Sequence, residues 1–307
     1  MDGMSTPPRT PTPADVAAAA NRIRPHVRRT PQLRTEIDGR PVVFKLEHLQ
    51  RSGSFKLRGA VNALLAGPAP RRVVTASGGN HGLGVATAAQ ALGLPVVVYV
   101  PESVPAAKAA GIEAAGAKLI RHGATYAEAA AAALAVGDEP GTRYLSAYDD
   151  PDVVAGQGTV TAEIVADDPD VDAVVVAVGG GGLAAGTALA ANRRQVFAVE
   201  PEHCQALHAA LEAGQPVDVT LDSVAASALG ATRVGEVPFR ILNAPNVTSV
   251  LVSDAELLAA RDRLWAEFRL AVEPAAAVPL AAWLAGRVPA ARPCFVLCGA
   301  NTSVTFA

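Results

Sequence analysis

The residues around Lys56 have the types and spacing that amine chemistry requires. Lys56 lies in the stretch 50–60, which follows an apolar run at 42–44 and precedes a helical pattern at 60–65. A lysine amine near such a strand-to-helix junction, flanked by small residues, can meet a ligand and form a Schiff base with a carbonyl compound. The ordinary alternative is a solvated surface lysine. One lysine does not decide between the two, so the rest of the chain must.

A glycine-rich turn at 77–84 is a second candidate for ligand binding. It follows a predicted strand at 72–76 and leads into a helical pattern. Free backbone N–H groups at the start of a helix attract anions. Ser77 and Asn80 add side-chain donors, and the His81 imidazole can orient or titrate. The alternative is a turn that serves only chain reversal, which would not require so many polar donors.

A second glycine-rich turn, Gly179 to Gly182, follows a predicted strand at 173–178. Without Cβ atoms, successive backbone amides can wrap a phosphate at the positive end of the following helix. The spacing does not match the dinucleotide fingerprint, which lies in the first strand–helix turn of its domain. The Gly-Lys-Ser/Thr of a Walker loop is also missing. The turn therefore predicts a phosphate site of another kind.

Two residues near the C-terminus complete the candidates. Cys298 follows a predicted strand at 294–297, at the strand end where ligands gather in α/β sheets. A thiol there suits a neutral ring nitrogen, and the alternative is a small buried hydrophobic residue. Glu273 can contact a polar edge of a ligand or cap a helix, and the sequence leaves both possibilities open.

Buried strands and Ala-rich helices must position these residues. Short apolar runs, mostly without alternation, are typical of parallel strands that are buried on both faces. The runs lie at 42–46, 72–75, 96–100, 117–120, 173–178, 196–199, 250–252 and 294–297. Segments of helical length separate them, which predicts an α/β fold with parallel sheets. No linker is evident, so two lobes would be interleaved in the sequence.

Two segments have the spacing of helix N-termini. Thr12 provides a capping side chain, followed by proline and then by Asp15 in the first turn. Ser253 and Glu256 have the spacing of a capping box. Apolar residues follow Glu256 at helical spacing, among them Trp265, and this pattern predicts that they belong to the core.

Composition excludes several classes of protein. Half of the 307 residues are hydrophobic, and the net charge of −3 comes without the basic stripe that nucleic acid requires. Three cysteines without metal-ligand spacing argue against a zinc site or a disulfide framework and favour the cytoplasm. The uncharged run 173–191 has the length of a membrane span, but the glycines in its middle argue against one. Residues 1–13 are expected to form a disordered lead.

Together these motifs resemble the serine/threonine dehydratases, which are pyridoxal-phosphate enzymes of the tryptophan-synthase-β fold (fold type II). The resemblance runs from about residue 14 to the end, and the matching segments come in the family's order. They are Ser-Phe-Lys-Leu-Arg-Gly-Ala at 54–60, Ser-Gly-Gly-Asn-His-Gly at 77–82, the glycines at 179–182, Glu-Pro at 200–201 and 273–274, and Cys-Gly-Ala-Asn at 298–301. The combination is specific, although no single segment is.

The resemblance implies a role for each candidate residue. Lys56 is the catalytic Schiff-base lysine, Asn80 is the partner of the ring hydroxyl, and Cys298 meets the pyridine nitrogen. The residues implied to bind pyridoxal 5'-phosphate are Phe55, Lys56, Asn80, Gly179, Gly180, Gly181, Gly182, Leu183, Glu273 and Cys298. Those implied to hold the substrate carboxylate are Ser77, Gly78, Asn80 and His81.

The resemblance also implies how the chain is organised. Each of two lobes is a mainly parallel twisted sheet flanked by helices. Residues 14–67 and 150–307 form a large cofactor-binding domain, and residues 68–149 form a small mobile domain that carries the substrate-carboxylate loop. The protein is expected to be a homodimer in the cytoplasm.

The implied reaction is the α,β-elimination of a small hydroxy amino acid. L-Serine or L-threonine, or both, would give a 2-oxo acid and ammonia. Members that racemise serine carry a second serine where this chain has Gly78, so elimination is predicted over racemisation. A serine racemase or a β-replacement enzyme of the same fold is the alternative. A non-catalytic protein that binds the cofactor is a further one.

Two other departures from the family pattern stand out. Relatives that bind a divalent cation carry a carboxylate six residues after the first Glu-Pro pair, where this chain has Ala206. No metal site is therefore expected near Glu200. Many relatives carry an aspartate where this chain has Ser227, and the sequence does not say what replaces that carboxylate.

Overall fold

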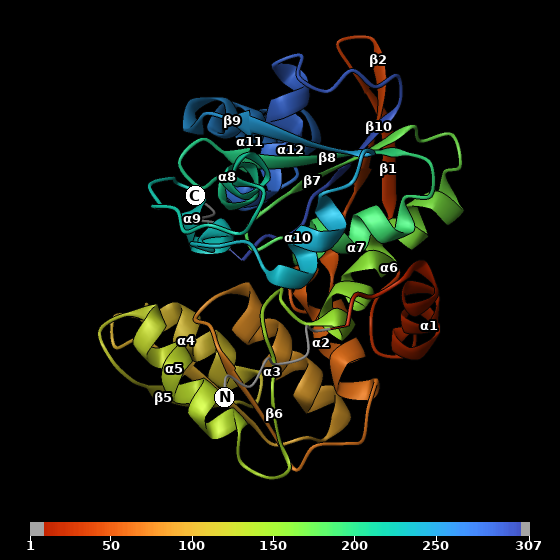
Figure 1. Cartoon of the computed structure of the whole chain (residues 1–307). Helices are drawn as coiled ribbons and strands as arrows, with labels where there is room; N and C mark the ends of the chain where they lie inside the picture. Colours follow the sequence, from red (N-terminus) through yellow and green to blue (C-terminus); the bar gives the residue numbers. More distant parts are fainter. Residues whose placement is uncertain (1–8, 302–307) are drawn as a thin grey trace.

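The structure, a computed structural model, describes residues 9–301 and forms two lobes, each built on its own sheet (Figure 1). One sheet has six strands in the order β1-β2-β10-β7-β8-β9, and the other has four in the order β5-β4-β3-β6. The predicted two-lobed α/β architecture is therefore confirmed. Residues 1–8, which make up most of the predicted lead, and residues 302–307 lie outside the described part.

The six-stranded sheet is parallel except at one edge. Its strands are β1 (Gln32–Ile37), β2 (Arg40–Lys45), β7 (Ala173–Ala177), β8 (Gln195–Pro201), β9 (Val247–Val252) and β10 (Pro293–Val296). The exception is the antiparallel pair β1–β2, joined by Asp38 and Gly39 with φ of 51° and 72°. Asp-Gly suits a two-residue hairpin because both positions need a left-handed backbone. The sequence did not predict β1, since this edge strand is mostly half-exposed and lacks an apolar run.

The four-stranded sheet is parallel throughout. Its strands are β3 (Arg72–Ala76), β4 (Val96–Val100), β5 (Lys118–Arg121) and β6 (Thr142–Tyr144). All of them lie within residues 68–149, the segment assigned to the small domain. The sequence did not predict β6, because its three residues are half-buried and carry no apolar run.

Helices cover both sheets, and their starts follow the sequence signals. They are α1 (Pro13–Ile23), η1 (Glu47–Leu49), α2 (Lys56–Leu65), α3 (Asn80–Leu92), α4 (Ala106–Ala114), α5 (Tyr126–Gly137), α6 (Pro151–Asp167), α7 (Gly182–Ala190), α8 (Ala206–Ala213), α9 (Ala226–Leu229), α10 (Glu236–Leu242), α11 (Asp254–Phe268) and α12 (Pro274–Leu284). Thr12 and Ser253 form capping boxes as predicted. Because Thr12 caps α1 and Arg9 pairs with Asp15 at 2.9 Å, ordered structure begins before residue 13.

Trp265 was wrongly assigned to the core. It is 48% exposed and lies on the outer side of α11, with the Arg269 guanidinium 5.7 Å from its ring centroid. Helical spacing alone did not reveal this, because a half-exposed aromatic ring at the edge of an apolar face follows the same period.

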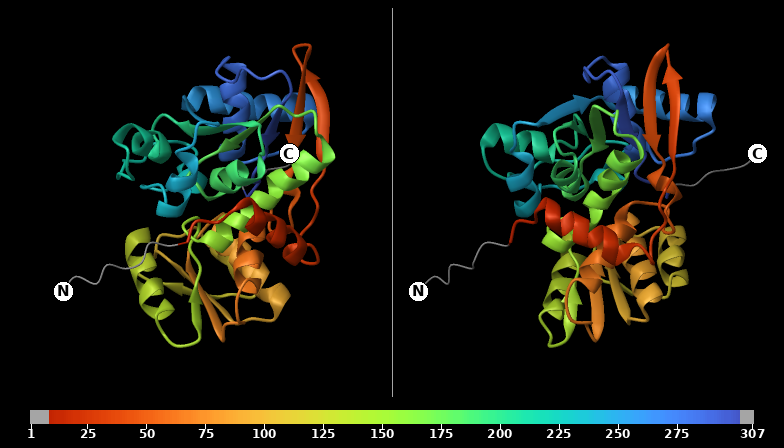
Figure 2. Two further views of the ribbon diagram at one scale, coloured as in Figure 1. Left: turned by 45° about the vertical axis from the view of Figure 1, so that its right-hand side comes forward. Right: turned by 90° about the vertical axis from the view of Figure 1, so that its right-hand side faces the viewer.

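Helices α2 and α6 lie where the two lobes meet (Figure 2). The apolar side chains of α2, such as Leu57 and Val61, belong to the hydrophobic cluster of the small lobe together with Val73 and Val98. Helix α6 contacts both α2 and α7. The domain boundary after residue 67 stays a prediction. Helix α2 lies before this boundary, in the segment assigned to the large domain, but its apolar side chains pack with the small lobe.

The uncharged run 173–191 forms β7 and α7 rather than one long helix. Within residues 9–301, no helix has the length and apolar character needed to cross a membrane.

Candidate active site

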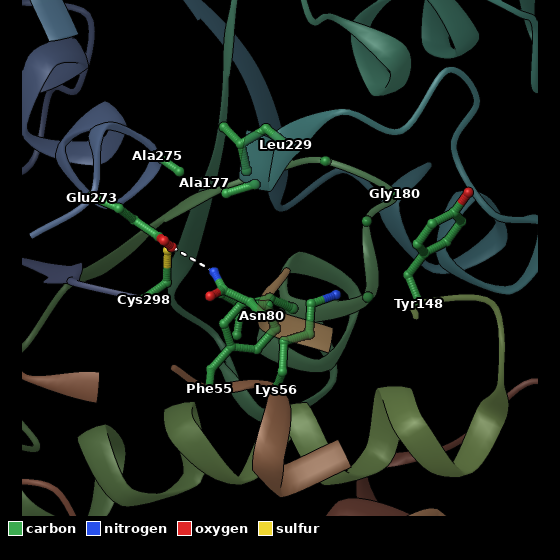
Figure 3. A pocket seen from close by; sticks show the side chains of 15 residues that line it. Phe55, Lys56, Asn80, Tyr148, Ala177, Gly180, Leu229, Glu273, Ala275 and Cys298 are labelled. Carbon is green, nitrogen blue, oxygen red and sulfur yellow. Dashed lines mark hydrogen bonds between the residues drawn. The ribbon is translucent and has the colours of Figure 1, made fainter. Parts of the chain in front are cut away.

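One pocket brings together most of the residues selected from the sequence (Figure 3). Its lining comes from Phe55, Lys56, Asn80, Tyr148, Ala177, Gly179, Gly180, Gly181, Gly182, Leu183, Ala228, Leu229, Glu273, Ala275 and Cys298. The strands β7 and β10 end at this pocket, as expected of a ligand site in a parallel sheet. Figure 3 shows Cys298 and Glu273 at one end, Gly180 and Tyr148 at the other, and Lys56 between them.

Lys56 is the first residue of α2, and its amine points into the pocket. The amine donates a hydrogen bond to the Ala147 carbonyl at 2.7 Å, and it lies 5.1 Å from the Phe55 ring centroid. Burial lowers the pKa of Lys56 to about 8, because an ammonium ion loses its hydration there. Roughly a tenth of the amine is then neutral at pH 7, against well under a thousandth for an ordinary lysine.

The four glycines form a loop that leaves no room for side chains. Gly181 has φ of +93°, a Cβ on Gly179 would lie 3.1 Å from Leu229, and a Cβ on Gly180 would overlap the Tyr148 ring. Helix α7 begins at Gly182, and no side chain caps it. The loop therefore presents an uncapped helix N-terminus to the pocket, which is the arrangement that a phosphate group needs.

Asn80, Glu273 and Asn301 form a hydrogen-bonded chain beside Cys298. The Asn80 amide donates to Glu273 at 2.7 Å and accepts a hydrogen bond from the Asn301 amide. Burial raises the pKa of Glu273 and also that of the Cys298 thiol. Cys298 thus stays neutral at this end of the pocket, as a neutral ring nitrogen would require.

The loop 77–81 lies at the start of α3 and lines a cavity next to the pocket. Gly79 is the N-cap of α3 without a side-chain cap, and the Ser77 hydroxyl accepts a hydrogen bond from its N–H at 3.1 Å. A Cβ on Gly78 would lie 2.6 Å from a Val104 methyl group, so a larger residue there would require Val104 to shift.

The His81 imidazole does not lie free for a substrate. Its Nε2 is 2.8 Å from the Thr75 hydroxyl and 3.2 Å from the Leu145 carbonyl, and the side chain is buried. Thr75 itself donates to the Leu145 carbonyl at 2.9 Å, which assigns the proton to Nε2. Burial, followed by the nearby Lys56 amine, lowers the pKa of His81 to about 3, so the ring is neutral.

The Glu200 carboxylate accepts hydrogen bonds from the start of helix α8. Its two carboxylate oxygens accept hydrogen bonds from the backbone N–H groups of Leu207 and His208, each at 2.8 Å. Ala206 provides no ligand next to it. Among residues 9–301, no three or more His, Cys, Asp or Glu side chains lie together in an arrangement that could hold a metal ion.

Sequence reasoning missed several residues of the site. Ala147 accepts the Lys56 hydrogen bond, and Tyr148 packs against the glycine loop. Lys108 lines the cavity next to the pocket. Sequence patterns did not single out Ala147, Tyr148 or Lys108, because only the packing of the two lobes brings them to the site. Ser227, where many relatives carry an aspartate, lines the same cavity as Lys108.

Comparison with known proteins identifies the family of this chain. The family model described as "Pyridoxal-phosphate dependent enzyme" matches residues 23–299. The L-threonine ammonia-lyase of Geobacter sulfurreducens is 37% identical over 94% of this chain and 75% of that protein. The serine racemase of Arabidopsis thaliana is 32% identical over 94% of this chain and 92% of that protein.

Solved structures show the same fold. A threonine deaminase from T.th. has a TM-score of 0.90 and 36% identity, covering 96% of this chain and all of that one. The maize serine racemase has a TM-score of 0.91 and 28% identity, covering 96% of this chain and 95% of that one. These matches cover almost the whole chain and therefore both lobes. The chain belongs to the pyridoxal-phosphate-dependent enzymes, within the serine/threonine dehydratase family.

Proposed function

We propose that this enzyme is a dehydratase that converts L-serine, L-threonine, or both to a 2-oxo acid and ammonia. The observation that carries the proposal is a single pocket in which a lysine of lowered pKa faces an uncapped glycine loop. The reaction removes the α-proton and the β-hydroxyl of the substrate, and hydrolysis of the resulting enamine releases ammonia.

The residues of the pocket fit pyridoxal 5'-phosphate from end to end. The Gly179–Gly182 loop and Leu183 would hold its phosphate, Cys298 would meet its ring nitrogen, and Asn80 its ring hydroxyl. Phe55 and Glu273 would line the ring, and Lys56 would bind the aldehyde carbon. When bound, the cofactor withdraws electrons from the α-carbon and so makes the α-proton acidic.

Lys56 serves as the base that takes the α-proton. Its environment suits this task because the lowered pKa supplies neutral amine near neutral pH. The Ala147 carbonyl, which accepts a hydrogen bond from Nζ, fixes the direction of the amine. Cys298, being neutral, would leave the ring nitrogen of the bound cofactor unprotonated, and the weaker electron withdrawal would favour prompt loss of the β-hydroxyl.

The substrate carboxylate would bind at the start of α3. Ser77, Gly78 and Asn80 surround the uncapped N-terminus of this helix, where N–H groups attract an anion. His81 would contribute through its place in the loop, because its ring is engaged with Thr75. We propose further that residues 68–149 move as a small domain and bring this loop to the substrate.

Racemisation is the second candidate. It is favoured by the similarity to the serine racemase of Arabidopsis thaliana. A racemase needs a second acid to protonate the α-carbon from the other face, and Gly78 offers no such group. The packing of Gly78 against Val104 also disfavours a hydroxymethyl group at this position.

Product analysis with L-serine, L-threonine and their D forms tests the proposal. The expected result is release of 2-oxo acid and ammonia from at least one L form. Release of D-serine from L-serine without 2-oxo acid would show a racemase instead. Borohydride reduction followed by peptide mapping should place the cofactor on Lys56, and an adduct on Lys45 or Lys108 would contradict the assignment.

We also propose a homodimer in the cytoplasm. The free, buried cysteines Cys204, Cys294 and Cys298 are compatible with a reducing compartment. Light scattering on the purified holoenzyme would give the mass, and a value of one chain would contradict the dimer.

A further inference from the structure

Two cavities open beside the Lys56 pocket, with volumes of about 440 and 370 Å³. They share five lining residues, which are Gly78, Gly79, Asn80, Lys108 and Ser227. The second cavity also contains Lys56 and therefore reaches the reacting groups. A substrate bound in this space next to Lys56 would share its cavity with Lys108 and Ser227.

Lys108 is the unpaired charge of this space. The charged side chains that line the two cavities are Lys56, Lys108 and Glu273, since the buried His81 ring is neutral. Lys56 donates to a carbonyl and Glu273 accepts from Asn80. Lys108 makes no hydrogen bond or ion pair within residues 9–301, although it is near enough to Glu273 to influence that carboxylate.

The position of Lys108 differs from that of the substrate-carboxylate loop. Lys108 lies in the first turn of α4, whereas the loop 77–81 opens α3, and Ser227 comes from α9 in the other lobe. If the loop binds the α-carboxylate, Lys108 and Ser227 face the part of the cavity that remains for the side chain of the substrate. An unpaired ammonium ion with a hydroxyl group nearby selects a carboxylate.

We propose that Lys108 and Ser227 form a second carboxylate site, so that the preferred substrate is a β-hydroxy amino acid with an acidic side chain. This inference rests on the proposed dehydratase function and narrows its substrate class. The chemistry is the same elimination. The water lost with the β-hydroxyl balances the water taken up in hydrolysis, so 3-hydroxyaspartate yields a 2-oxo dicarboxylic acid and ammonia.

Steady-state kinetics of the holoenzyme test this site. We expect kcat/KM for L-threo- or L-erythro-3-hydroxyaspartate to exceed that for L-threonine by about tenfold or more. In Lys108→Gln the ratio of the two kcat/KM values should fall by about 30-fold, as expected when a hydrogen bond to a charged group is lost. Lys118→Gln, which removes an exposed lysine of β5 in the same lobe, should leave the ratio unchanged.

The outcomes separate this inference from the proposed function. An unchanged ratio in Lys108→Gln, or equal losses for both substrates, would overturn the second carboxylate site and leave the dehydratase intact. The same holds if the wild type prefers L-threonine or L-serine. Failure of the wild type to release 2-oxo acid from any of these substrates would instead overturn the proposed function.

A binding measurement without turnover gives an independent test. Malonate carries two carboxylates and acetate one, and neither can undergo elimination. By calorimetry, malonate should bind the wild-type holoenzyme more tightly than acetate by about tenfold or more, and Lys108→Gln should remove most of this difference. Equal affinities of malonate for the wild type and for Lys108→Gln would overturn the site.

Discussion

Lys56 and Arg58 lie two residues apart on α2, yet their surroundings differ in almost every respect. Lys56 has one hydrogen-bond acceptor, the neutral Ala147 carbonyl, at 2.7 Å. The Arg58 guanidinium is fully buried and donates to Glu47 at 2.6 Å and to Glu163 at 2.8 Å. Its remaining contacts are with the Thr159 hydroxyl and the Arg28 carbonyl.

A second cation completes this buried group. Lys45 donates to Glu163 at 2.6 Å and to the Thr30 carbonyl at 2.7 Å. Lys45, Glu47, Arg58 and Glu163, the Arg58 cluster, therefore balance two positive charges with two negative ones. They come from β2, η1, α2 and α6, so the cluster ties the start of α2 to the large lobe.

The difference teaches how one helix can hold a reactive amine. The Arg58 cluster compensates each of its charges, and therefore fixes α2 without itself being reactive. Lys56, two residues away, is left without a carboxylate partner in hydrogen-bonding contact, and its proton is held weakly. Arg58 thus contributes to stability and Lys56 to reactivity. Substitutions of Arg58 should therefore lower mainly the free energy of unfolding, and substitutions of Lys56 mainly the activity.

The largest expected effect is on activity. Lys56→Ala should lower kcat by about 10³-fold or more, because the base and the covalent anchor of the cofactor are lost together. The free energy of unfolding should change little, since the removed amine is poorly solvated and has a single hydrogen bond. Assays of 2-oxo acid release beside urea unfolding measure both, with Lys118→Ala as the control. Retention of a tenth of the activity would contradict the role of Lys56.

Arg58→Met should act mainly on stability. The substitution leaves Glu47 and Glu163 buried with only Lys45 to balance them, and breaking such a cluster costs about 3–5 kcal/mol. Urea unfolding of the purified protein measures this loss. Adding Glu47→Gln to Arg58→Met should restore part of it, because one unpaired charge is then removed. A loss below about 1 kcal/mol would show that the cluster contributes little.

The sequence predicts the surroundings of Lys56 far better than those of Arg58. Lys56, the glycines at 77–84 and those at 179–182 are local patterns that follow strands. The structure places Lys56 and Gly179–Gly182 at one pocket, and it places Gly78 and Gly79 at the cavity next to that pocket. The buried strands β7 and β10 were recognisable because every residue in them is apolar or small. The chemistry of the site is therefore largely readable from short segments.

The Arg58 cluster was not predicted, because its members are up to 118 residues apart and are joined only by the fold. The same reason explains why Lys108, Ala147 and Tyr148 were missed. The orientation of His81 also depends on a distant residue, Leu145, and on the register between β3 and β6. The half-exposed β1 and β6 gave too little hydrophobic pattern to be recognised.

His81 is a second buried group of lowered pKa, and it should make the stability of the protein depend on pH. The folded protein keeps this ring neutral down to about pH 3, whereas the unfolded chain binds a proton below about pH 6.5. Proton uptake on unfolding therefore lowers stability as the pH falls from 6.5 towards 3. Between pH 7 and pH 5 the contribution of His81 is about 2 kcal/mol.

Urea unfolding at the two pH values should show that this loss is smaller by about 2 kcal/mol in His81→Gln. The exposed His122, replaced by Gln, is the matched control and should leave the loss unchanged. If His81→Gln and the wild type lose the same stability between pH 7 and pH 5, His81 does not behave as a buried structural group and would again become a candidate for direct contact with the substrate.

The smallest expected effect comes from adding a side chain to the glycine loop of the pocket. In Gly180→Ala the new Cβ would overlap the Tyr148 ring, so either Tyr148 or the glycine loop must shift. The affinity for pyridoxal 5'-phosphate, measured by absorbance titration of the cofactor-free protein, should fall about tenfold, which corresponds to about 1.4 kcal/mol. Gly67→Ala places a Cβ in open solvent at a backbone angle that alanine tolerates, and it should leave the affinity unchanged. Equal affinities for both variants would mean that the loop tolerates a side chain, and that its glycines serve the turn rather than the phosphate.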